Sequence, residues 1–165
     1  MAALAQPLLE RLLDAFPVAR LGLVDTSDQI EVLPIVFARV GMMLYSPVDG
    51  KPKKHPRLSR LAAIRRVGEV GLVLDHYDQD WEQLWWVKLD VSAQVVGQED
   101  KHWSDAETAL RLKYPQYQST PLFSGTPTAI AMHVTRVRWW ASCEEQGLVA
   151  WLEQHAVPAN AAGSQ

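Results

Sequence analysis

The chain has 165 residues, 48% hydrophobic and 21% charged, a balance typical of one globular domain rather than of a disordered or fibrous protein. The net charge of −3 excludes a surface built throughout to hold nucleic acid or an anionic membrane. The lone cysteine, Cys143, excludes an intrachain disulfide, and no apolar stretch reaches the ~18 residues that span a bilayer. We therefore expect a cytoplasmic protein without nucleic-acid or membrane partners, in which any anion site is local.

The first predicted element is an amphipathic helix. Apolar residues recur at steps of three and four between Leu4 and Phe16, and Pro17 helps to end the helix. Charged residues such as Glu10 interrupt the apolar run, so we expect an amphipathic helix here rather than a secretory signal peptide.

Strands dominate the rest of the chain. β-rich runs separated by turn residues predict six strands, at 18–24, 30–38, 42–45, 69–76, 85–95 and 128–139. The clearest is 85–95, where apolar residues alternate with polar ones, so that one face is core. Mainly β structure with a few helices favours a closed or partly closed antiparallel barrel, which hides the edges of the sheet.

Further helices are predicted after Pro56 and over 101–113, with 114–126 as a loop. Residues 1–156 are expected to form a single domain. The end of the chain, 157–165, consists largely of small and polar residues and is expected to be a flexible tail.

The segment from Ser46 to Arg66 is strongly basic. It carries seven of the 16 Lys and Arg residues: Lys51, Lys53, Lys54, Arg57, Arg60, Arg65 and Arg66. Pro56 suits the first turn of a helix, and cationic side chains beside the free N–H groups of a helix start favour phosphate binding. The alternative is that the run is only a solvated face. Arg57 and Arg60 are expected to be at least partly solvated on either interpretation.

Trp86 lies on the polar face of its predicted strand, together with Lys88 and Asp90. A ring of this size needs cover. A dimer contact or a packed helix would supply it, or Trp86 forms an aromatic wall beside a planar ligand. Both interpretations of Trp86 hold if the ligand lies at a dimer interface.

Neither a metal site nor a catalytic triad is predicted. Asp75 and Tyr77 flank His76 on a strand and so point to the opposite face, which argues against a shared ion. His133 lies in an alternating strand, a position more typical of an interior histidine than of a catalyst. The sequence also lacks G-x-S-x-G, P-loop and G-x-G-x-x-G motifs, so catalytic side chains stay unassigned.

Four segments together resemble one known family. They are LPIVFA (33–38), YSPVDGKPKKHPRLSRL (45–61), LVLDHYDQDWEQLWWVKLD (72–90) and LRLKYPQY (110–117). In order and spacing they resemble the pyridoxamine 5′-phosphate oxidase-like class, in its branch of deazaflavin-dependent enzymes. The resemblance implies a six-stranded antiparallel FMN-binding split β-barrel and a homodimer whose interface holds FMN or a deazaflavin (coenzyme F-420).

The resemblance also implies roles for individual residues. In relatives, basic residues after the third strand hold the cofactor phosphate, and the matching residues here are Lys51, Lys53, Arg57 and Arg60. Ser46 and Val48, at the end of that strand, would lie along the isoalloxazine ring. Tyr77 and Lys88 are candidates for substrate contacts.

The function implied is that of a flavin- or deazaflavin-dependent oxidoreductase, which transfers hydride between the bound cofactor and a small substrate that the sequence does not identify. The cofactor supplies this chemistry, so a catalytic triad is not needed. The alternative is a non-catalytic protein of the same fold that binds or stores the cofactor or haem. The absence of a clear axial-ligand motif favours the flavin.

Overall fold

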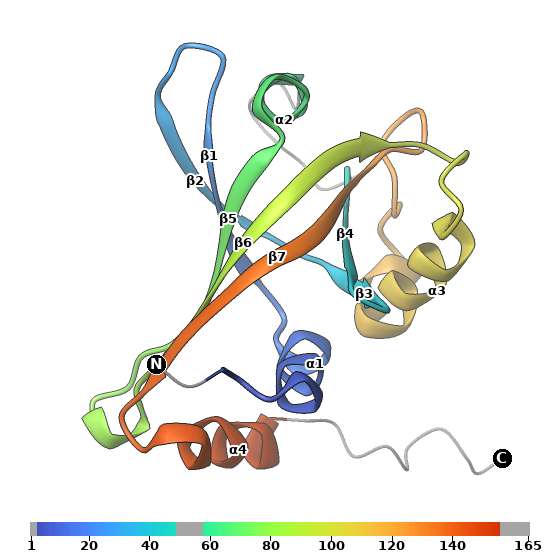
Figure 1. The fold of residues 1–165 in the computed structure, drawn as a ribbon. Helices are drawn as coiled ribbons and strands as arrows, with labels where there is room; N and C mark the ends of the chain where they lie inside the picture. The colour runs from blue at the N-terminus through green and yellow to red at the C-terminus, as the bar shows by residue number, and fades with distance from the viewer. Residues whose placement is uncertain (1–2, 49–57, 156–165) are drawn as a thin grey trace, which may run out of the picture.

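The computed structural model describes residues 3–48 and 58–155 (Figure 1). Within these residues, seven strands form one antiparallel sheet in the order β2-β1-β5-β6-β7-β4-β3. The strands are β1 (Ala19–Val24), β2 (Ile30–Ile35), β3 (Ala38–Val40), β4 (Met43–Pro47), β5 (Glu69–His76), β6 (Trp85–Val96) and β7 (Ala129–Ala141). The α-helices are α1 (Gln6–Ala15), α2 (Leu58–Val67), α3 (Trp103–Lys113) and α4 (Glu144–His155), with short 3₁₀ helices η1 (Trp81–Gln83) and η2 (Pro115–Gln118).

The prediction of one strand over 30–38 is wrong, and the sheet therefore has seven strands rather than six. The run divides into β2, which pairs with β1, and β3, which pairs with β4 at the opposite edge of the sheet. The chain crosses between the edges at Phe37. There, the backbone N–H of Phe37 donates to the Tyr114 hydroxyl at 3.0 Å instead of to a neighbouring strand.

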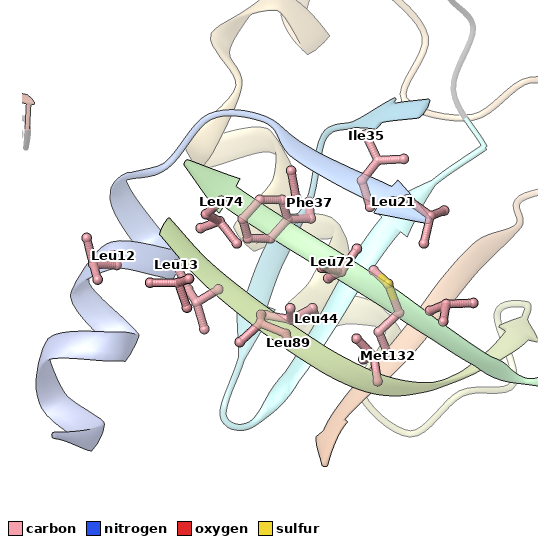
Figure 2. Packing of buried hydrophobic residues seen from close by; sticks show 14 of the residues in the cluster. Leu12, Leu13, Leu21, Ile35, Phe37, Leu44, Leu72, Leu74, Leu89 and Met132 are labelled. Carbon is pink, nitrogen blue, oxygen red and sulfur yellow. The ribbon is translucent and has the colours of Figure 1, made fainter. Parts of the chain in front are cut away.

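A hydrophobic core fills the concave side of the curled sheet, where α1, α2 and α4 pack against it (Figures 1 and 2). The four buried leucines of α1 are Leu8, Leu9, Leu12 and Leu13, as the helical periodicity predicted. In β6, the buried and less buried residues alternate from Trp85 to Ala93, which confirms the predicted core face of that strand.

Helix α4 was not predicted. Its Leu148, Trp151 and Leu152 are buried against the core. Trp151 contacts Trp85 edge to face, with ring centroids 5.3 Å apart. The ring of Phe16, just after α1, also contacts Trp151, with centroids 5.1 Å apart. Helix α4 therefore packs against both the end of α1 and the first residue of β6.

Candidate cofactor site

The candidate site lies where β4 ends and α2 begins. The connecting residues 49–57 lie outside the described part of the chain, so the predicted phosphate contacts of Lys51, Lys53 and Arg57 do too. The end of β4 is held by two backbone hydrogen bonds. The backbone N–H of Val48 donates to the Thr128 carbonyl, and the Val48 carbonyl accepts from Ser124, both at 2.9 Å.

Ser46 and Val48 are buried within one subunit, with 2% and 5% exposure. Ser46 pairs with Ile130 of β7, and strand alternation puts its side chain on the same side as Leu44, which is part of the core. Val48 belongs to the same core cluster. A ligand at this end of the sheet would therefore meet the edge of the buried layer rather than two open side chains.

Arg60 lies in the first turn of α2 and is only 8% exposed, which corrects the expectation of partial solvation. It shares the inner side of the helix with Leu61, Ala63 and Ile64, all buried. An arginine is rarely buried to this extent. The first turn of a helix also presents backbone N–H groups without intrahelical acceptors and partial positive charge. Positive charge is thus held inside the protein at this helix start.

The other basic residues of α2 differ from Arg60. Arg65 and Arg66 lie in the last turn and are exposed. The Arg66 guanidinium donates to the Asp25 carbonyl at 2.5 Å and lies 3.1 Å from the Asp28 carboxylate. These two side chains are part of a solvated face, as the alternative interpretation predicts for this part of the basic run.

Trp86, Lys88 and Tyr77 do not join this site within one subunit. Ser46 pairs with Ile130 and, through it, lies level with Val95 of β6, nine residues from Trp86 and roughly 30 Å along the strand. Trp86 is half-buried on the convex face, with the Lys88 ammonium 4.3 Å from its ring centroid. Tyr77, in the loop after β5, is 74% exposed.

The remaining candidates for chemistry form no metal centre. Residues 3–48 and 58–155 contain no group of three His, Cys, Asp or Glu side chains able to hold an ion. His76 Nε2 lies 4.0 Å from Asp78. Contrary to expectation, His133 is exposed, because strand alternation in β7 buries Met132 instead.

A separate cleft of about 290 Å³ was not anticipated from the sequence. It lies between η1 and α4, and its lining includes His76, Glu82, Cys143, Gln146 and Trp151. The thiol of Cys143 is exposed. The apolar spacing of Leu148, Trp151 and Leu152 was the available signal for α4, and hence for this cleft.

Two polar groups at the C-terminal end of α3, the half-buried Lys113 and the buried Tyr114, point toward α1 and the crossing between β2 and β3. The Lys113 ammonium donates to the Leu13 carbonyl at 2.7 Å and lies 3.8 Å from the centre of the Phe37 ring. Burial lowers the pKa of Lys113 to about 7. Burial also raises the pKa of Tyr114 to about 12, and its hydroxyl lies 2.8 Å from the carbonyl oxygens of both Pro17 and Phe37. This cluster fixes the crossing between β2 and β3.

No helix in the described ranges is long and apolar enough to cross a membrane. No protein-family model matches the sequence, and no curated protein matches it either.

Solved structures do match the fold. A FAD-binding protein from Mesorhizobium loti superposes with a TM-score of 0.61 at 16% identity, over 82% of this chain and 92% of that one. HutZ, the haem storage protein of Vibrio cholerae, gives a TM-score of 0.63 at 9% identity, over 82% and 93%. A putative pyridoxamine 5′-phosphate oxidase from Listeria innocua gives 0.54 at 19% identity, over 79% and 94%. The fold is therefore the split β-barrel of the pyridoxamine 5′-phosphate oxidase-like class, a fold with flavin-binding and haem-storing members.

Proposed function

We propose that this chain is a flavin- or deazaflavin-dependent oxidoreductase that transfers hydride between its bound cofactor and a small substrate. The observation that carries the proposal is the buried Arg60 in the first turn of α2, in a fold that also occurs in a FAD-binding protein. A buried guanidinium at a helix start favours a phosphate, because both supply hydrogen-bond donors and positive charge.

The residues present fit such a group. Arg60 would hold the phosphate together with Lys51, Lys53 and Arg57 of the basic segment, while Ser46 and Val48 form the wall behind the ring. The cofactor, when bound, supplies the hydride chemistry at its own ring. The chain's own side chains bind, orient and exclude water, which agrees with the absence of a triad motif in the sequence.

Residues far from Arg60 would act across a dimer interface. Trp86 lies too far along β6 to contact the same cofactor as Arg60 of its own subunit, so its proposed role beside the ring requires a homodimer. Tyr77 and Lys88 stay proposed substrate contacts for the same reason. Cytoplasmic localisation is likewise part of the proposal.

The phosphate site is tested by titrating FMN and riboflavin, which lacks the phosphate, into wild type and two variants. Arg57→Ala and Arg60→Lys should each weaken FMN binding at least about tenfold, or roughly 1.4 kcal/mol, and leave riboflavin binding unchanged. Arg60→Lys keeps the charge in this buried position but loses the planar fork.

Arg65→Ala is the matched control, because Arg65 lies exposed at the other end of α2. It should leave the preference for FMN over riboflavin intact. If both site variants also retain the wild-type preference, the basic segment is only a solvated face and the phosphate site is wrong.

A second candidate function is storage or transport of haem or of the cofactor without catalysis. The likeness to a haem storage protein favours it. Haem gives a Soret band near the blue edge of the visible spectrum, whereas flavin and deazaflavin do not, so absorption distinguishes the two. Turnover with a reductant then separates a flavin carrier from a flavin enzyme.

A further inference from the structure

The cleft between η1 and α4 has no part in the proposed function. Its volume is about 290 Å³, and its lining comes from two short segments, 76–83 and 143–154. Helix α4 lies at the end of the sheet away from α2 (Figure 1). The backbone N–H of Ser142 donates to the Leu84 carbonyl at 2.9 Å and so joins the two segments beside the cleft. A hollow of this volume is at the lower end of the range for small-molecule sites.

The lining of the cleft combines an apolar part with a set of hydrogen-bond acceptors. The apolar part is formed by α4, where Trp151 is buried and Gly147 and Ala150 lie beside the cleft. The acceptors are carboxylate and amide oxygens, on Asp80, Glu82, Gln83, Gln146 and Gln154. Such a lining suits a ligand with a short aliphatic part and a head that donates hydrogen bonds.

The charge around the cleft has one sign. Residues 69–87 and 139–155 carry five and three Asp or Glu residues and no Lys or Arg. Within the described part of the chain, the Glu82 carboxylate has no hydrogen-bond or ion-pair partner. The Asp80 carboxylate accepts from two neutral donors, the Glu82 backbone N–H at 3.1 Å and the Gln83 amide at 3.2 Å. A cleft lined by one sign of charge concentrates ions of the opposite sign, so this cleft favours a cation.

Gly147 keeps one wall of the cleft free of a side chain. It lies inside α4, where glycine is less favourable than alanine. A Cβ here would lie 3.7 Å from the Cβ atoms of Ala141 and Cys143, which is ordinary van der Waals contact. Packing within the described residues therefore leaves room for alanine. The bare backbone instead widens the cleft, as a site for another molecule requires.

We propose that this cleft binds an ammonium group carried on a short aliphatic chain. An ammonium has three N–H donors, which suit the Glu82 carboxylate and the amide oxygens beside it, while the methylene groups pack on Trp151. A metal ion fits less well, because residues 3–48 and 58–155 contain no group of three ligating side chains. The inference does not depend on the cofactor or on the homodimer of the proposed function.

Cys143 reports on the charge of the cleft, because it is exposed, lines the cleft and is the one cysteine of the chain. Its rate of modification is measured with aminoethyl and sulfonatoethyl methanethiosulfonate, a cation and an anion. The cation-to-anion rate ratio should exceed that of free mercaptoethanol. Glu82→Gln should lower the ratio about threefold at low ionic strength, because it removes one nearby charge.

Glu153→Gln is the matched control, since it makes the same charge change on α4 outside the cleft lining. It should change the ratio much less than Glu82→Gln does. A wild-type ratio equal to that of mercaptoethanol, or an equal fall in both variants, would show that the cleft itself does not select cations and would overturn the proposal.

Protection of Cys143 tests binding directly. The reagent is uncharged methyl methanethiosulfonate, and the ligand is putrescine, a short diamine. About 10 mM putrescine should slow the wild-type reaction at least about fivefold, as for a Kd of about 2.5 mM or below. The diol of the same chain length should give no protection, and Glu82→Gln should weaken the effect of putrescine.

A second arm replaces putrescine with Nα-acetyl-lysine amide, which separates two sources of the ammonium group. Protection by both ligands means that a lysine side chain also fits the cleft, and protection by putrescine alone means that the site takes free amines. No protection by putrescine, or equal protection by the diol, would overturn the proposal. The protein is used without added flavin, so either failure leaves the proposed function standing.

Discussion

At the scale of single residues, burial decides which charged groups matter. Seven basic residues in one segment could all have been solvated, and the structure separates buried Arg60 from exposed Arg65 and Arg66. The sequence identified the basic segment but did not predict which of its arginines are buried. Helical periodicity places Arg60 beside Leu61, but it does not show how closely the sheet packs against that part of the helix. Similarly, nothing local predicted that Lys113 would point its ammonium into the gap between α3 and α1.

Lys113 makes the stability of the protein depend on pH. Burial lowers its pKa from 10.5 to about 7 in the folded state. Between these two values the unfolded chain binds more protons, so the free energy of unfolding rises with pH, by at most about 1.4 kcal/mol per pH unit. Below about pH 7 both states are protonated, and this gain is absent.

Chemical denaturation at about pH 6 and about pH 9 measures this effect. Lys113→Met should flatten the rise, and Lys101→Met, at an exposed lysine, should not. The range stops below pH 10 because Tyr45 and Tyr114, whose pKa values are raised to about 12, destabilise the fold at higher pH. An equal rise in wild type and Lys113→Met would show that the ammonium is not buried as described.

At the scale of secondary structure, the sequence predicted the elements that have a regular pattern and missed the features that depend on tertiary contacts. The alternation in β6 and the leucine spacing in α1 correctly predicted both elements and their buried faces. The division of 30–38 could not be read locally, because the acceptor that replaces a strand partner for Phe37 is Tyr114, 77 residues away in sequence. Helix α4 had a readable apolar spacing, but Gly147 inside it weakens the helical pattern.

Tyr114→Phe tests the role of that hydroxyl in the crossing. The change leaves the buried Phe37 N–H without its acceptor, and a buried unsatisfied donor costs about 1–3 kcal/mol. Tyr77→Phe, at a tyrosine that is 74% exposed, is the matched control and should cost almost nothing. Denaturant midpoints measured at constant pH give both values. Equal midpoints for the two variants would mean that the crossing between β2 and β3 is held by packing alone.

At the scale of the whole molecule, the split barrel places its two sets of functional candidates at opposite ends of one sheet. The end of β4 is level with Val95, near the end of β6, and the buried arginine is in α2, whereas Trp86 is at the start of β6, just after η1. The sequence predicted the members of both sets but not their separation, since register along β6 and β7 depends on pairing. The proposed role of Trp86 beside the cofactor therefore requires the proposed homodimer.

The absorption spectrum of the purified protein, recorded as isolated and during titration with FMN and deazaflavin, tests the central claim most directly. We predict that one of these cofactors binds with a shifted and structured visible band, and that a hydride donor or acceptor then changes its redox state in the bound form. A Soret band, with FMN and deazaflavin spectra unperturbed by the protein, would contradict the proposed oxidoreductase and support haem storage.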